Sequence, residues 1–244
     1  MRTTRIYHPG TLSIHQEVSI EPQAATHLTR VLRVQAGAEL IMFNGDGNEY
    51  KAVVSRVQRN SAWANIIDAQ SVDRESILNI HLGQGISKGE RMDYTIQKAV
   101  ELGVTSITPL LTEHSTVQLK ADRIEKRIRH WQGIIDSACE QCGRNRVPVI
   151  ETPVKLQQWL VQTGENALKL TLEPNATETF SNMTCTGTEI ILLIGPEGGL
   201  SEHEIRLSSD NGFTGIRLGP RILRTETAAV TCLSIIQNRW GDLC

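Results

Sequence analysis

The pattern of apolar and polar positions divides the chain into two parts with different predicted elements. Residues 1–72 contain strand-like runs, and AELIMFN and EYKAVVSRV flank Gly45-Asp46-Gly47, which is a strong hairpin signal. Upstream of this hairpin, Ala25, Leu28 and Leu32 recur at helical spacing. We therefore predict a small β-barrel or sandwich with one short helix for this part of the chain.

The polar segment at residues 71–76 is the best linker candidate, and after it strands alternate with helices. The predicted strands are short apolar runs such as ILNIHLG and EIILLIG, whereas segments such as 89–103 place their apolar residues on one helical face. Alternation of this kind is typical of a parallel sheet with helices on both faces. We therefore predict an α/β domain over residues 73–244.

The last three predicted strands each end in a loop that contains glycine or proline. In a parallel sheet the carboxyl ends of these strands lie at one edge, and ligands of open α/β sheets bind outside that edge. We therefore predict one pocket built from three loops, which are Glu173-Pro174, Gly195-Pro196-Glu197-Gly198-Gly199 and Gly219-Pro220-Arg221.

The second of these loops resembles a phosphate loop but lacks its lysine. Neither G-x-x-x-x-G-K-[ST] nor G-x-G-x-x-G occurs, and Glu197 would repel a phosphate. Ser201 and Glu204 have capping-box spacing, so the N-terminal amides of the next helix are partly occupied by the protein itself. A neutral or cationic ligand with an adenosine-like body therefore suits the loop better than a pyrophosphate. The alternative is that the glycines only make a tight turn.

The third loop carries Arg217, Arg221 and Arg224 among apolar residues. Arginines beside an apolar slot can hold a polyanion or stabilise negative charge on a substrate base. Arg221 is accordingly a candidate for RNA contact. The alternative interpretation is a solvated turn in which Arg224 pairs with Glu226.

Composition adds a weak indication of the partner. The 25 Lys and Arg residues nearly balance the 27 Asp and Glu residues, so net charge gives no reason to expect nucleic acid. Of the 25 basic residues, however, 18 are arginine. The planar guanidinium suits phosphates and base edges, and the imbalance therefore favours an RNA or nucleotide partner.

Five arginines outside the three loops are candidates for RNA contact. Arg30 and Arg33 are spaced to share one face of the predicted N-terminal helix, and Arg5 adds to a basic edge there. Arg144 and Arg146 follow a long predicted helix. The alternative for each group is an ordinary solvated surface.

No metal site or export signal is predicted. Cys139-x-x-Cys142 supplies half of a zinc site, but the other cysteines are isolated and the histidines lack ligand spacing. An odd total of five cysteines does not indicate a disulfide framework. The sequence shows no signal peptide or membrane span, so we expect a soluble, cytoplasmic protein without a membrane partner.

Four motifs in order strongly resemble the ribosomal RNA small subunit methyltransferase E family. They are GERMDYTIQKAVELGV, ACEQCGR, LLIGPEGGLS and LGPRILRTETA, and the resemblance extends to RIYHP and HLTRVLRV near the N-terminus. This family belongs to the SPOUT class of S-adenosylmethionine-dependent enzymes. The resemblance implies a PUA-like β-barrel for RNA binding over residues 1–72. It also implies a methyltransferase domain over 73–244 whose end is threaded as a trefoil knot.

The resemblance further implies a homodimer that methylates N3 of one uridine, position 1498 in standard numbering, in 16S ribosomal RNA of the small subunit. Uridine N3 carries a proton, so the site should offer a base or a cation that stabilises the resulting anion. We predict Arg224 as the cation and Glu197 as the base, with Glu226 as the alternative base. The candidate cofactor-binding residues are Leu172, Ile194, Gly195, Gly198, Gly199, Leu218, Gly219, Ile222 and Leu223.

Overall fold

The computed structural model describes residues 3–115, 121–164 and 166–243. Contacts between Cα atoms divide the chain into two compact units. The first unit contains Met1–Glu75 and Asp136–Val147, and the second contains Ser76–Ile135 and Pro148–Cys244.

The division differs from the linear one predicted from the sequence. The expected boundary after residue 72 lies close to the observed one after Glu75. Residues 136–147, however, group with the N-terminal unit, although the α/β pattern had assigned them to the second domain. Hydrophobic periodicity reports local structure only, so it does not indicate that a later segment returns to an earlier unit.

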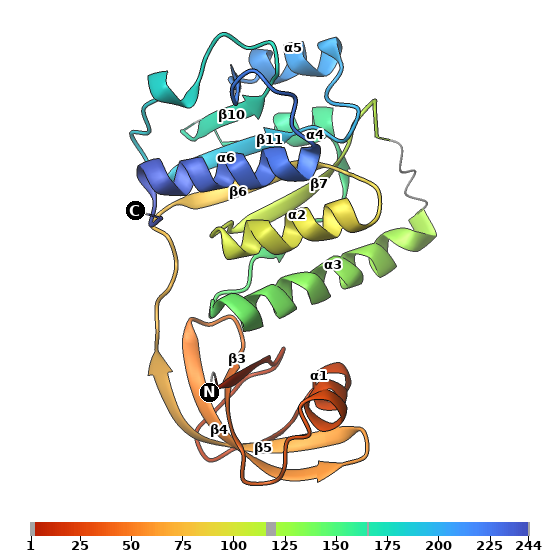
Figure 1. The fold of residues 1–244 in the computed structure, drawn as a ribbon, viewed down its shortest axis with the longest axis vertical. Coiled ribbons are helices and arrows are strands. Elements are labelled where there is room, and N and C mark those ends of the chain that lie inside the picture. The colour runs from red at the N-terminus through yellow and green to blue at the C-terminus, as the bar shows by residue number, and fades with distance from the viewer. Residues whose placement is uncertain (1–2, 116–120, 165, 244) are drawn as a thin grey trace. The chain divides into compact units, whose positions relative to one another are not determined.

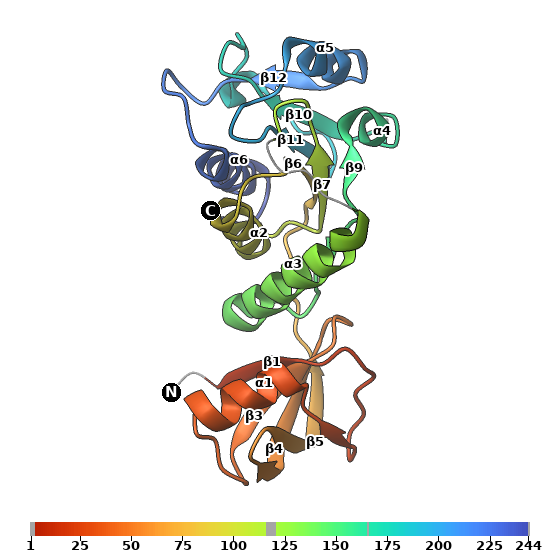
Figure 2. The ribbon, with the colours of Figure 1, turned by 90° about the vertical axis from the view of Figure 1, so that its right-hand side faces the viewer.

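The first unit is built on one mixed sheet, seen with its helix in Figure 2. Its strands have the order β1-β3-β4-β5-β2, and all neighbours are antiparallel except β1 and β3. The predicted hairpin is confirmed, since Gly45 and Gly47 adopt φ values of +93° between paired strands. The strands are β1 (Thr4–Tyr7), β2 (Glu17–Ser19), β3 (Glu39–Phe43), β4 (Asn48–Gln58) and β5 (Ser61–Ser71).

The predicted N-terminal helix changes its geometry halfway. An α-helix, α1 (Pro22–Thr26), continues as a π-helical segment, η1 (His27–Val31). Ala25 and Leu28 are buried as predicted, but Leu32 is 44% exposed. A π-helical turn has more residues than an α-helical turn and rotates the positions that follow out of the apolar stripe.

The same change separates two arginines that were expected to share a helix face. Arg30 lies in η1, whereas Arg33 lies beyond it in the left-handed region with φ +53°. Arg30 donates a hydrogen bond of 2.8 Å to Asn60 Oδ1. Both side chains are exposed, but they do not form the helical i,i+3 pair that the sequence predicted.

The second unit contains a parallel sheet with the strand order β12-β10-β11-β6-β7-β8, and β9 pairs with β7. The predicted alternation of strands and helices is therefore confirmed. The three strands expected to share an edge, β10, β11 and β12, are direct neighbours. The strands are β6 (Asn79–Gly85), β7 (Ser106–Leu111), β8 (Val149–Ile150), β9 (Val154–Lys155), β10 (Leu168–Leu172), β11 (Glu189–Ile194) and β12 (Thr214–Ile216).

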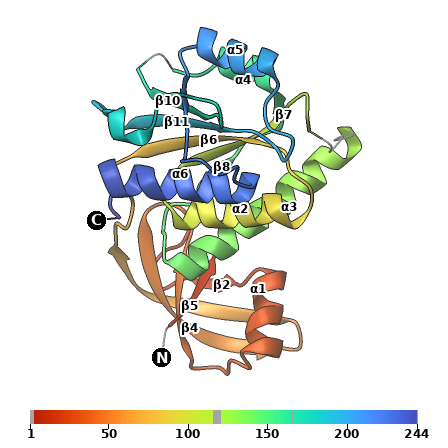
Figure 3. The ribbon, with the colours of Figure 1, turned by 45° about the horizontal axis from the view of Figure 1, so that its top comes forward.

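Helices cover both faces of this sheet. In Figures 1 and 3, α2 and α6 lie side by side on one face, while α4 and α5 lie on the other. Ile191 and Leu193 of β11 pack with Trp159 of α4, and Leu192 points to the opposite face as the strand alternates. The helical elements are α2 (Glu90–Glu101), α3 (Ala121–Cys142), α4 (Leu156–Leu160), η2 (Phe180–Asn182, a 3₁₀ turn), α5 (Glu202–Asp210) and α6 (Thr225–Trp240).

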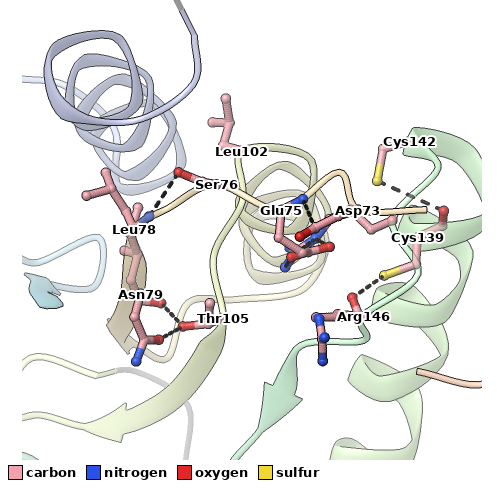
Figure 4. Close-up of polar contacts among 12 residues, drawn as sticks. Asp73, Glu75, Ser76, Leu78, Asn79, Leu102, Thr105, Cys139, Cys142 and Arg146 are labelled. Atoms are coloured by element: carbon pink, nitrogen blue, oxygen red, sulfur yellow. Dashed lines mark hydrogen bonds and ion pairs between the residues drawn. The ribbon is translucent and has the colours of Figure 1, made fainter. Parts of the chain in front are cut away.

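The carboxyl end of α6 is fixed by a buried amide. Gln237 is fully buried, its Nε2 donates to the carbonyl of Leu102 at 2.9 Å, and its Oε1 accepts from Ser76 Oγ at 2.7 Å. Ser76 Oγ in turn accepts from the backbone N–H of Leu78, as drawn in Figure 4. These bonds join the carboxyl end of α6 to the end of α2 and to the segment before β6.

Candidate functional site

The three predicted loops meet at one cavity of about 400 Å³. It lies at the carboxyl ends of β10, β11 and β12, where an open parallel sheet binds its ligands. Glu197 and Arg221 also contribute to its wall. The nine candidate cofactor-binding residues all line it, namely Leu172, Ile194, Gly195, Gly198, Gly199, Leu218, Gly219, Ile222 and Leu223.

A larger cavity, of about 620 Å³, lies on the face of the sheet covered by α4. Its lining includes Asn79, His81 and Trp159, and burial lowers the pKa of His81, so this imidazole is neutral at pH 7. The cavity lies toward the amino ends of β6 and β11, away from the edge where the three predicted loops meet. We therefore take the smaller cavity as the functional site.

Glycine is required in the site loops for two different reasons. Gly199 and Gly219 have φ values of +70° and +77°, and a Cβ at either position would meet nothing within 4 Å. Gly195 and Gly198 are crowded instead: a Cβ would lie 3.0 Å from the Gly199 carbonyl carbon and 2.8 Å from His114 Cβ, respectively. The loop is thus a tight turn, as one interpretation held, and also the wall of a cavity.

The helix after this loop is capped by its own side chains. Ser201 Oγ accepts from the Glu204 N–H at 3.1 Å, and Glu204 Oε2 accepts from the Ser201 N–H at 2.9 Å, which confirms the predicted capping box. The other oxygen of the buried Glu204 accepts from the Glu113 N–H at 2.9 Å. The protein itself therefore caps part of the first turn of α5.

Glu197 does not project freely into the cavity. Its Oε1 accepts hydrogen bonds from the backbone N–H of Lys88 at 2.9 Å and from Arg91 Nη1 at 3.1 Å. Burial by itself would raise the pKa of Glu197, but these hydrogen bonds and the Arg91 charge outweigh it and hold the pKa below its ordinary value. A carboxylate held in this way is a weak base, so the structure favours an anchoring role over the predicted role in proton transfer.

Arg224 stands immediately before α6 and is exposed. Its carbonyl accepts from the Ala228 N–H at 2.8 Å, which fixes its backbone at the start of the helix. The alternative interpretation paired Arg224 with Glu226, but no such ion pair occurs among the described residues. Within the same described part of the chain, Glu226 Oε2 is buried without a hydrogen-bond partner. Arg224 is therefore a cation that can face a substrate.

The sequence interpretation missed Thr225 and Gln84. Thr225 is buried, lines the cavity and donates to the Gly195 carbonyl at 2.7 Å. Gln84, at the end of β6, donates to Thr225 Oγ1 at 3.0 Å. The only signal for Thr225 in the sequence is its place after Arg224, and Gln84 gives none, because β6 is distant along the chain.

Two of the predicted RNA-binding arginines are internal to the first unit. Arg5 forms an ion pair with the buried Glu49 and donates to Asn145 Oδ1 at 2.5 Å. Burial alone would raise the pKa of Glu49, but hydrogen bonds from Arg74 and Arg5 hold it below its ordinary value. Arg5 therefore stabilises a buried carboxylate and presents little surface to RNA.

Arg144 is likewise only 5% exposed, and its Nε donates to Glu75 Oε2 at 3.0 Å. It holds the returning segment 136–147 against the end of the N-terminal segment within the first unit. Arg5 and Arg144 thus leave the set of RNA-contact candidates. Arg30, Arg33, Arg146 and Arg221 are exposed and remain in it.

Both cysteines of Cys139-x-x-Cys142 are at least partly buried and contact backbone carbonyl groups. Cys139 Sγ donates to the carbonyl of Arg146 (Figure 4), and burial raises the pKa of this thiol to about 12. In the described ranges, no group of three or more His, Cys, Asp or Glu residues is arranged to hold a metal ion. None of the described helices is long and apolar enough to cross a membrane.

Comparisons with known proteins identify the family. Residues 74–237 match the RNA methyltransferase domain, and residues 20–67 match the RNA methyltransferase PUA domain. Ribosomal RNA small subunit methyltransferase E of Buchnera aphidicola subsp. Schizaphis graminum is 39% identical over 99% of this chain and 98% of its own length.

Two solved structures cover 100% of this chain and 100% of their own. A putative methyltransferase from Legionella pneumophila, in complex with the bound cofactor SAM, is 46% identical with a TM-score of 0.96. Ribosomal RNA small subunit methyltransferase E from Neisseria gonorrhoeae, bound to S-adenosyl methionine, is 37% identical with a TM-score of 0.92. The first unit is accordingly PUA-like and the second is a methyltransferase domain, and the chain belongs to the ribosomal RNA small subunit methyltransferase E family of RNA methyltransferases.

Proposed function

We propose that this protein transfers a methyl group from S-adenosylmethionine to N3 of one uridine, position 1498 in standard numbering, in 16S ribosomal RNA. The observation that carries the proposal is the cavity in which the three loops meet, beside an exposed arginine at the start of α6. The S-adenosylmethionine-bound relatives of the same fold support the choice of cofactor.

The residues of the cavity fit this cofactor. Apolar side chains of Leu172, Ile194, Leu218 and Leu223 suit a flat adenine ring, and the glycine loop exposes backbone groups to its polar edge. The absence of a lysine from the loop and the capping of α5 by Ser201 and Glu204 disfavour a pyrophosphate. Bound S-adenosylmethionine supplies an electrophilic methyl group on a sulfonium, and no metal is needed.

Arg224 is proposed to stabilise the uridine anion. Uridine N3 becomes a nucleophile when it loses its proton, and the negative charge then spreads to O2 and O4 of the base. A guanidinium at the edge of the cavity lowers the energy of that anion by charge and hydrogen bonding. The hydrogen bond from the Ala228 N–H to its carbonyl fixes the backbone of Arg224 at the amino end of α6.

Glu226 is proposed as the group that accepts the N3 proton. Its Oε2 makes no hydrogen bond within the described part of the chain, whereas the carboxylate of Glu197 is occupied by Lys88 and Arg91. Hydrogen bonds to the charged form of a carboxylate make it a weaker base, and this disfavours Glu197 as the proton acceptor. This assignment reverses the order of the two carboxylates that the sequence suggested.

The RNA is proposed to contact exposed arginines of both units, namely Arg30, Arg33, Arg146 and Arg221. Each of these guanidiniums can bind phosphate or a base edge. We also propose a homodimer of the SPOUT class with a trefoil knot, working in the cytoplasm. A solution mass of twice 27.1 kDa by light scattering would support the dimer, and a mass of 27.1 kDa would contradict it.

The proposed function is tested by methyl transfer to ribosomal particles. Small subunits from a strain lacking the activity are incubated with the protein and radiolabelled S-adenosylmethionine, and the modified nucleotide is mapped by primer extension. Label at the expected uridine supports the proposal. Label elsewhere contradicts the assigned position, and no label on free 16S RNA or on subunits contradicts the activity.

A further inference from the structure

Three groups form a buried chain of hydrogen bonds behind the cavity. Gln84 Nε2 donates to Thr225 Oγ1 at 3.0 Å, and Thr225 Oγ1 lies 2.7 Å from the Gly195 carbonyl oxygen. A hydroxyl has one proton, so a hydroxyl that accepts from Gln84 gives its proton to Gly195. The chain therefore runs in one direction, from β6 through the first residue of α6 to the loop after β11.

The orientation of the Gln84 amide follows from its surroundings. Its nitrogen lies 3.0 Å from the Gly85 carbonyl oxygen and 3.4 Å from the Gly195 carbonyl oxygen, and only a donor is stable between two carbonyl groups. Its Oε1 is buried and has no partner in the described part of the chain. Such an acceptor costs free energy of folding, so a glutamine here is not explained by stability alone.

The two carbonyl groups that accept from Gln84 each have another hydrogen-bond donor. The Gly85 carbonyl also accepts from Ser87 Oγ at 3.3 Å, and the Gly195 carbonyl accepts from Thr225. Replacement of Gln84 by methionine, which has a similar length, would leave these carbonyl groups bonded and would remove the unpaired oxygen. The fold should therefore tolerate Gln84→Met.

We propose that Gln84 and Thr225 are positioning residues that set the shape of the cofactor cavity, an inference that rests on the proposed function. Gly195 lines the cavity from the glycine loop and Thr225 from the first position of α6, and the bond between them joins these two elements. Gln84 lies behind them and fixes the rotation of the Thr225 hydroxyl. Arg224 directly precedes Thr225, so the hydrogen bond between Thr225 and Gly195 also positions Arg224.

The test compares cofactor affinity with stability in three variants. Isothermal calorimetry with S-adenosylmethionine gives Kd, and thermal unfolding without ligand gives Tm. We expect Thr225→Val to weaken binding about tenfold and Thr225→Ser to stay close to the wild type, because serine restores the hydroxyl. We expect Gln84→Met to weaken binding roughly fivefold with an unchanged or higher Tm, which a merely structural role would not produce.

Thr95→Val is the matched control. Thr95 is as buried as Thr225, and its Oγ1 donates to the Arg91 carbonyl at 2.9 Å, but it does not line the cavity. This variant should bind S-adenosylmethionine as the wild type does. A loss of affinity in Thr95→Val equal to that in Thr225→Val would overturn the inference, because it would show a general effect of a lost buried hydroxyl.

A double variant tests whether the two residues act as one chain. If Gln84 acts through Thr225, Gln84→Met combined with Thr225→Val should bind no more weakly than Thr225→Val alone. Additive losses would overturn the inference, as would wild-type affinity in Thr225→Val. A wild-type protein that fails to bind S-adenosylmethionine would overturn the proposed function instead, so the two failures are distinguishable.

Discussion

The carboxylate of Glu197 lies 3.1 Å from Nη1 of Arg91 and joins the glycine loop after β11 to the start of α2. The backbone N–H of Lys88 bonds the same oxygen at 2.9 Å. A residue that stood out in the sequence as an obstacle to phosphate thus has a second role, which is to hold the loop in place.

Glu197→Gln should separate anchoring from proton transfer. The amide oxygen of glutamine still accepts from Lys88 and Arg91, so the loop keeps its position. We expect kcat to fall by less than about tenfold, whereas Glu226→Gln should lower it about a hundredfold or more, as loss of a general base does. Single-turnover methylation of small subunits measures both, and the reverse order of effects would return the role of base to Glu197.

The hydrogen bonds from Lys88 and Arg91 to the Glu197 carboxylate should also make the stability of the fold fall at acidic pH. The folded-state pKa of Glu197 lies below its ordinary value of 4.5, so its contribution to stability is fully present above that pH. It is lost as the pH falls through the folded-state pKa. The difference in Tm between the wild type and Glu197→Gln should therefore shrink below pH 4.5, and a difference that grows on acidification would contradict the anchoring role.

Arg224→Ala should impair turnover and spare the cofactor. The side chain is exposed and does not line the cavity, so the Kd for S-adenosylmethionine should stay within about twofold of the wild type. Loss of the charge that stabilises the uridine anion should lower kcat about 10²–10³-fold. Arg206→Ala, on the exposed face of α5, is the control and should keep full activity. An equal loss of cofactor affinity in Arg224→Ala would show that Arg224 belongs to the cofactor site.

Gly199→Val should abolish both cofactor binding and turnover. The residue has φ +70°, which costs a β-branched residue about 1–3 kcal/mol, and the loop would have to change its path to relieve this strain. Gly133→Ala in α3 is the matched control, since its Cβ meets nothing within 4 Å and alanine favours a helix. Gly133→Ala should bind S-adenosylmethionine normally, and normal binding by Gly199→Val would show that the turn tolerates a side chain.

Most of the site was predictable because its determinants are local. Strand, glycine turn and helix follow one another in residues 189–205, and the parallel strands bring the three loops to one edge without further information. Even the capping box of Ser201 and Glu204 can be identified from spacing alone. The same local signals define the hairpin at Gly45 and Gly47.

The parts that were missed depend on contacts between distant segments. The carboxylate of Glu197 accepts a hydrogen bond from Lys88, which lies more than a hundred positions earlier. Arg5 is likewise held by Glu49 and Asn145. The sequence does not distinguish an arginine that faces RNA from one that pairs with a buried carboxylate. Periodicity also assumes one helical geometry, so the π-helical turn that exposes Leu32 escaped it.

Arg144 and Arg146 offer a direct comparison of a structural and a surface arginine two positions apart. Arg144→Ala removes the partner of Glu75 within the first unit and should lower stability by about 3–5 kcal/mol, measured as a fall in Tm. Arg146 is exposed, so Arg146→Ala should leave Tm unchanged. It should instead weaken RNA binding several-fold. The slope of log affinity against log salt concentration should also fall by the amount expected for about one phosphate contact. If Arg146→Ala binds RNA with the wild-type affinity and salt dependence, this arginine does not contact RNA, and the proposed contacts reduce to Arg30 and Arg33 of the first unit and Arg221 of the second.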